Sequence, residues 1–135
     1  MKRAIGLALV WCMGAPLGAT QGLWDEIIPA QTEAYELGKT QRTEAKSQRE
    51  ILFCKAHWEG FSEAIWDQKA RLFAGLTQDK VHETIDYWAA QLEISDYDAE
   101  LETADAAYYA LIYFGPLQEQ RIEATRKLGT CAPFD

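Results

Sequence analysis

The sequence is short of the residue types that carry most enzyme chemistry. It has two histidines, three cysteines and three serines in 135 residues. A c-type haem needs a Cys-x-x-Cys-His run, a di-iron bundle needs two Glu-x-x-His pairs, and a phosphate loop needs closely spaced glycines. None of these motifs is present in the sequence. We therefore expect a protein that is not an enzyme and that holds no cofactor or metal.

The two histidines, His57 and His82, leave one alternative open. Asp79 stands three residues before His82 and makes an approximate half of a di-iron ligand set, but the sequence has no second half. A zinc ion bound by both histidines and a carboxylate would satisfy the usual ligand count. A helical bundle that binds a metal or a small ligand therefore remains an alternative.

Long apolar runs are missing beyond the N-terminal segment, and no window alternates apolar and polar residues as a strand does. The N-terminal segment has Lys2 and Arg3, then an uncharged run from Ala4 to Ala19. This pattern is typical of a secretory signal, and the run is short for a membrane span of about 20 apolar residues. We predict a cleaved signal peptide over residues 1–19 and a periplasmic or secreted domain over 20–135. Retention of the segment as an anchor is the alternative.

The cysteines agree with an oxidising compartment. Cys12 lies in the predicted signal, so the mature chain keeps Cys54 and Cys131. Such a pair favours a structural disulfide, whose loop of about 78 residues stabilises the fold by about 4 kcal/mol in the chain-entropy model. The alternative is a reduced Cys54 that acts as a nucleophile with His57, one helical turn away.

Apolar spacing predicts an all-α domain. Residues 23–38 carry a short helical pattern interrupted at Pro29, and residues 39–49 are polar, as in a solvated helix or a linker. Four stronger segments have apolar residues three or four positions apart, and they cover residues 51–72, 81–92, 95–111 and 117–128. We expect the first to stop at Gly75 and the last at Gly129. The result is a small four- to five-helix bundle closed by one disulfide.

In two of these segments the apolar residues form a stripe along one helix face, here called the seam, and the two seams define the expected core. The first seam consists of Ile51, Cys54, Trp58, Phe61, Ile65 and Leu72. The second, on residues 95–111, consists of Tyr97, Leu101, Ala104, Tyr108 and Leu111.

Positive charge is scarce. The formal net charge is −8, and it becomes more negative when Lys2 and Arg3 leave with the signal. Such a surface repels nucleic acid and anionic lipid. Residues 83–105 contain eight acids and no Lys or Arg. Some of these acids suit the first turn of a helix, and as a surface the stripe favours a basic protein partner.

Aromatic residues supply the rest of the expected interface. Tyr108 and Tyr109 point about 100° apart on a helix, so both cannot face one core equally, and Trp66 falls outside the seam of its helix. Exposed Tyr and Trp are common interface anchors, with packing against a neighbouring helix as the alternative. The expected contact residues are Asp98, Glu102, Asp105, Tyr108, Tyr109 and Trp66.

One motif resembles a known family. The run CKAHWEGF, from Cys54 to Phe61, resembles the Cys-x-x-Tyr-x-x-Gly pattern in the Tai group of periplasmic immunity proteins. Residues 76–92 and 104–111 are similar in layout to the second half of that group. Its members neutralise amidase toxins delivered by neighbouring bacteria, so the resemblance implies a small helical inhibitor that binds a toxin.

We therefore expect an exported, non-enzymatic helical protein that binds a protein partner as an inhibitor, immunity protein or adaptor. Two alternatives remain. One is the periplasmic bundle that binds a small ligand or metal. The other is a structural subunit of an envelope complex, which the sequence does not separate from a binding protein.

Overall fold

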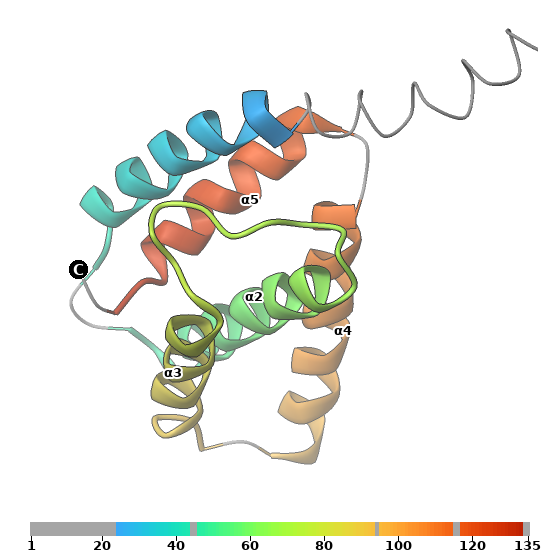
Figure 1. Ribbon diagram of the computed structural model, residues 1–135. Coiled ribbons are helices and arrows are strands. Elements are labelled where there is room, and N and C mark those ends of the chain that lie inside the picture. The colour runs from blue at the N-terminus through green and yellow to red at the C-terminus, as the bar shows by residue number, and fades with distance from the viewer. Residues whose placement is uncertain (1–23, 44–45, 94, 115–116, 134–135) are drawn as a thin grey trace, which may run out of the picture.

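The computed structural model describes residues 24–43, 46–93, 95–114 and 117–133, which contain five helices and no strand (Figure 1). The N-terminal helix covers residues 24–40. It is followed by α2 (Gln48–Trp66), α3 (Gln78–Ala89), α4 (Asp96–Phe114) and α5 (Gln118–Thr130). The all-α prediction is confirmed. The predicted signal peptide, residues 1–19, lies outside the described residues.

Side-chain caps set where α2 and α3 begin. The Ser47 hydroxyl accepts a hydrogen bond from the backbone N–H of Glu50, and the Glu50 carboxylate accepts one from the backbone N–H of Ser47. This reciprocal capping box sets the start of α2 at Gln48. The polar composition of residues 39–49 did not indicate this start. Thr77 caps α3 with a single bond, in which its hydroxyl accepts from the N–H of Lys80.

α2 ends earlier than the apolar spacing predicts. Its last residue is Trp66, and Gln68 then adopts a left-handed backbone with φ of 60°. The expected extension through Leu72 to a stop at Gly75 is therefore wrong. Residues 67–77 form a loop that passes over α2 in Figure 1, and this loop buries Phe73 in the core. The apolar residues continue past the helix because the loop, too, covers the core.

The N-terminal helix runs through Pro29 without the predicted interruption. Proline removes one backbone N–H from a helix, which costs least where water can reach the carbonyl left behind. Pro29 and the residue four positions earlier, Asp25, are both exposed, so the missing bond lies on the solvent side.

The N-terminal helix and α5 lie side by side, and their backbones touch at two glycines (Figure 1). A Cβ atom added to Gly38 would overlap the carbonyl oxygen of Arg126, and one added to Gly129 would overlap that of Tyr35. Gly129 does not end α5, as the sequence suggested, because the helix continues to Thr130. Because Gly129 has no side chain, the N-terminal helix can approach α5 closely at this point.

α2 is the central helix, and it packs against α3, α5 and most extensively against α4. Four of its predicted core positions are buried, namely Ile51, Cys54, Trp58 and Phe61. On α4 the predicted seam holds at Leu101 and fails at Ala104, which is exposed. Tyr108 is 59% exposed, whereas Tyr109 is buried and Leu101, Asp105 and Ile112 are half-buried. Apolar residues on both sides of α4 made the two registers hard to distinguish.

Candidate functional site

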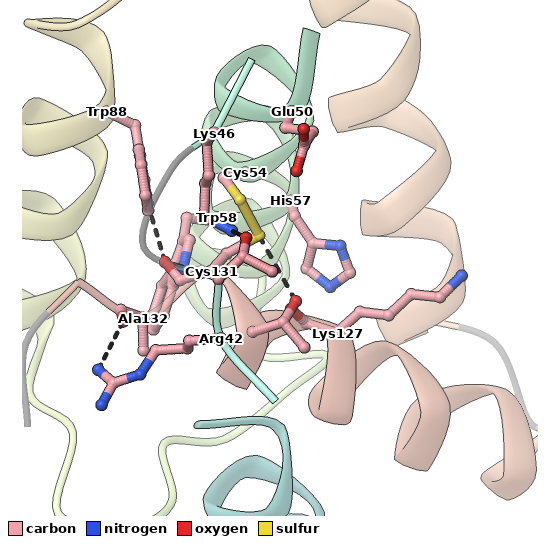
Figure 2. Close-up of a disulfide and its surroundings, with 12 residues drawn as sticks. Arg42, Lys46, Glu50, Cys54, His57, Trp58, Trp88, Lys127, Cys131 and Ala132 are labelled. Atoms are coloured by element: carbon pink, nitrogen blue, oxygen red, sulfur yellow. Dashed lines mark hydrogen bonds between the residues drawn. A yellow bond between two sulfur atoms is a disulfide. The ribbon is translucent and has the colours of Figure 1, made fainter. Parts of the chain in front are cut away.

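Cys54 and Cys131 form a disulfide between the middle of α2 and the residue that follows α5 (Figure 2). Their Cα atoms are 5.2 Å apart, and both side chains are buried. The predicted pairing is confirmed. The alternative of a nucleophilic Cys54 is wrong, because its sulfur is bonded to Cys131 and presents no thiolate.

The backbone beside the disulfide is held by three long-range hydrogen bonds that the sequence did not predict (Figure 2). The carbonyl oxygen of Cys131 accepts from the indole N–H groups of Trp58, at 3.0 Å, and Trp88, at 2.8 Å. The Arg42 guanidinium donates to the carbonyl oxygen of Ala132 at 2.9 Å. Both indoles are buried, so these bonds also satisfy their polar atoms. The disulfide region is therefore a structural junction of α2, α3, α5 and the residues after the N-terminal helix.

His57 is fully buried in this junction. Its Nε2 atom lies 2.7 Å from the carbonyl oxygen of Ala124, which can only accept, so Nε2 of the neutral ring carries the proton. Burial lowers the pKa of His57 from 6.5 to about 3, and the bond to Ala124 offsets only part of that effect. His57 is a neutral core residue at physiological pH.

Tyr109 packs directly on His57 and is 6% exposed, with the two ring centroids 3.9 Å apart. Burial raises the pKa of the Tyr109 hydroxyl, and the nearby charge of Asp105 raises it further. Tyr109 was predicted to contact a partner, and in this structure its ring is buried against His57 instead of being exposed. Its divergence from Tyr108 is present, but Tyr109 is the residue that turns inward.

Trp66 is 81% exposed, the highest exposure among the large apolar side chains described. It borders a shallow hollow of about 490 Å³ between α2 and α3 that is widely open to solvent. The other residues of this hollow are Glu59, Ser62, Glu63, His82 and Ile85. We call it the Trp66 hollow.

The other expected contact residues do not join Trp66. Tyr108 borders a separate hollow between α4 and α5, with Glu119, Glu123 and Lys127. Asp105 borders a third hollow near the start of α2, with Lys46 and Arg49. Asp98 and Glu102 belong to α4, but their side chains lie outside the described part of the chain. Among the predicted residues whose side chains the structure describes, Trp66, Tyr108 and Asp105 therefore border three separate hollows.

A fourth hollow is basic, and the sequence analysis missed it because residues 39–49 were interpreted as a solvated helix or a linker. It has a volume of about 470 Å³ and is bordered by Lys39, Arg42 and Lys46, with no acid among its lining residues. The N-terminal helix, α3 and α5 all end near it. Cations stabilise such helix ends, and Arg42 bonds two carbonyls there, those of Lys39 and Ala132. Helix termination accounts for these charges.

The two histidines lie in different surroundings, since His57 is in the core and His82 is exposed at the Trp66 hollow. Within residues 24–133, excluding the parts left undescribed, no three or more His, Cys, Asp or Glu side chains cluster as metal ligands. None of the helices described is both long and apolar enough to cross a membrane. No protein-family model, curated protein or solved structure matches this chain.

Proposed function

We propose that this chain is an exported, non-enzymatic helical protein that binds a protein partner, as an inhibitor, immunity protein or adaptor. The basic and apolar N-terminal pattern supports export. The buried disulfide supports it independently, because such bonds persist mainly in the periplasm and outside the cell. The resemblance of residues 54–61 to the Tai group is consistent with this class of protein.

The exposure of Trp66 is the observation that carries the binding proposal. Trp24, Trp58 and Trp88 are at most 9% exposed, whereas Trp66 leaves 81% of its surface in water. Exposed indole surface is hydrated unfavourably, and Trp is among the residues that dominate the free energy of protein association.

Packing within the fold does not account for Trp66. It is the last residue of α2, and the chain turns away from the helix immediately afterwards. An indole at this place adds little to the core, so the fold tolerates a smaller residue there. A side chain that the fold does not require, and that water does not favour, is well suited to an interface.

The non-enzymatic part of the proposal is supported by the state of Cys54 and His57, the pair that the sequence offered as a nucleophile and its partner. The Cys54 sulfur is part of the disulfide, and the His57 imidazole is enclosed and bonded to a backbone carbonyl. Neither group is accessible to a substrate.

The test compares partner binding by two matched variants. Trp66→Ala removes the proposed anchor, whereas Leu117→Ala removes a side chain that is 57% exposed and makes no capping hydrogen bond at the start of α5. With the partner isolated from the native source, we expect Trp66→Ala to weaken its affinity at least about 30-fold, or 2 kcal/mol. We expect Leu117→Ala to change the affinity less than about threefold.

Thermal unfolding of both variants is the control. Each should melt within a few degrees of the wild type, because neither side chain is buried. Equal binding by Trp66→Ala and the wild type would remove Trp66 from the interface.

A further inference from the structure

The Trp66 hollow combines an exposed aromatic ring with negative charge. Glu59 and Glu63 lie on its α2 side. The Lys55 ammonium is 2.6 Å from the Glu59 carboxylate and partly neutralises it. Glu63 is exposed, and its carboxylate makes no ion pair with any described residue. Glu63 is therefore the carboxylate of the hollow that is available to a cation.

The ends of the helices add to this negative potential. α2 has no basic residue in its last turn, and Asp67 follows Trp66 directly. The C-terminal end of a helix carries a partial negative charge, which cations stabilise. On α3, Asp86 lies one turn after His82 and so extends the acidic surface on that side. Lys69 is the next cation along the chain, and it is not among the residues of the hollow.

Two other tryptophans of the chain, Trp24 and Trp88, have a cationic side chain over the ring. The guanidinium groups of Arg71 and Arg121 lie 5.4 Å and 5.5 Å from the ring centre of Trp24. The Lys46 ammonium lies 5.9 Å from that of Trp88. No described Lys or Arg occupies this position over Trp66, although Glu59 and Glu63 border the same hollow.

We infer that the Trp66 hollow receives an arginine side chain of the protein partner, with the guanidinium over the indole ring and hydrogen-bonded to Glu63. The planar guanidinium stacks on aromatic faces and bonds a carboxylate with two parallel N–H groups. An anionic group would be repelled by Glu63 and Asp67, and an aliphatic group would leave the Glu63 carboxylate without a partner in the interface. This inference rests on the proposed function, since it specifies the chemistry of the partner at that site.

A peptide titration tests the inference without the natural partner. The probe is the blocked peptide acetyl-Gly-Gly-Arg-Gly-Gly-amide, and its matched control carries citrulline, which has the same shape but no charge. The readout is the indole N–H signals in proton–nitrogen spectra of the mature protein, with the Trp66 signal assigned from a Trp66→Phe variant. We expect the arginine peptide to shift the Trp66 signal progressively, while the signals of the buried Trp24, Trp58 and Trp88 stay in place.

Two acid variants locate the carboxylate. Glu63→Gln should raise the dissociation constant of the peptide at least about threefold, because it removes the charged acceptor. Glu119→Gln, at the separate hollow beside Tyr108, should leave it unchanged. An unmoved Trp66 signal, an equal shift with citrulline, or equal effects of the two variants would each overturn the inference.

Partner binding by Trp66→Leu separates this inference from the proposed function. Leucine keeps apolar surface but has no aromatic face, so an arginine-bearing partner should lose about as much affinity with Trp66→Leu as with Trp66→Ala. If Leu restores affinity that Ala loses, a partner still binds at Trp66 but its group is aliphatic, and the inference is wrong while the proposed function stands.

Discussion

His57 shows how a polar residue is used as part of a core. Its imidazole packs against both Phe53 and Tyr109 and donates from Nε2 to the carbonyl oxygen of Ala124. A neutral imidazole can make these ring contacts and this hydrogen bond. A charged imidazolium in the same place would be removed from water, which costs free energy. The protonation state of His57 is therefore linked to the folded state.

This linkage predicts that the protein loses stability in mild acid. The pKa of His57 is about 3 in the folded protein, against 6.5 for an ordinary histidine, so the unfolded chain binds the proton first. The free energy of unfolding should be unaffected above pH 7 and fall by about 1.4 kcal/mol per pH unit below pH 6. Urea unfolding at pH 7, 6 and 5 measures this slope.

His57→Gln is the control for the acid effect, because glutamine keeps an N–H donor but does not titrate. Its unfolding free energy should be nearly flat between pH 6.5 and 5, where ordinary carboxylates remain ionised. Below that window the capping carboxylate of Glu50, whose pKa Ser47 lowers by hydrogen bonding, begins to contribute as well. Equal slopes for the variant and the wild type would show that His57 is not the titrating group.

Single residues also mark the limit of what the sequence could predict about the site. The position of Trp66 outside the seam of its helix correctly indicated an exposed side chain. The choice between Tyr108 and Tyr109 could not be made, because it depends on which side of α4 meets His57. The basic hollow was missed because Lys39, Arg42 and Lys46 border it only after helix ends distant in sequence come together.

Among the elements, the pairing of the N-terminal helix with α5 depends on the absence of side chains. Gly38 and Gly129 allow backbone contact, and the buried Gln31 amide donates to the Thr125 hydroxyl in the same interface. Gly129→Ala should lower the free energy of unfolding by at least about 2 kcal/mol, because the new methyl group overlaps the carbonyl oxygen of Tyr35. Chemical denaturation of the variant provides the measurement.

Gly75→Asn is the matched glycine control. Gly75 has a positive φ of 71°, but nothing lies within 4 Å of the place where its Cβ would stand, and asparagine tolerates this backbone. Its effect should stay below about 1 kcal/mol. A mild effect of Gly129→Ala, similar to that of Gly75→Asn, would mean that the two helices can separate without loss.

Element types were predictable where the apolar spacing was regular, and element ends were not. The spacing of Ile51, Cys54, Trp58 and Phe61 identified α2 correctly. The same spacing continued into Leu72 because the loop 67–77 also packs on the core. Where a loop is as apolar as a helix, only the local backbone, here the left-handed Gln68, determines the end.

At the scale of the whole molecule, the C-terminal segment is held in place by covalent and polar bonds together. The disulfide links Cys131 to Cys54, 77 residues away, and the carbonyl of the same residue accepts from Trp58 and Trp88. Replacing both cysteines by alanine should lower the free energy of unfolding by about 4 kcal/mol, because a long loop is no longer closed in the unfolded chain. Denaturation midpoints of the oxidised wild type and the double variant test this.

A loss below about 1 kcal/mol in the double variant would contradict that account. It would show that the two indole hydrogen bonds and Arg42 hold the segment without the disulfide. The contribution of the disulfide to stability would then be secondary to that of the polar junction.

The central claim, that this is an exported protein which binds a protein partner, is tested most directly by native mass spectrometry of material purified gently from its own source. We predict a chain lacking residues 1–19 and two cysteine hydrogens, in a stoichiometric complex with a second protein that dissociates from the Trp66→Ala variant. A chain that retains the N-terminal segment, or that carries a metal or small molecule and no protein, would contradict the account.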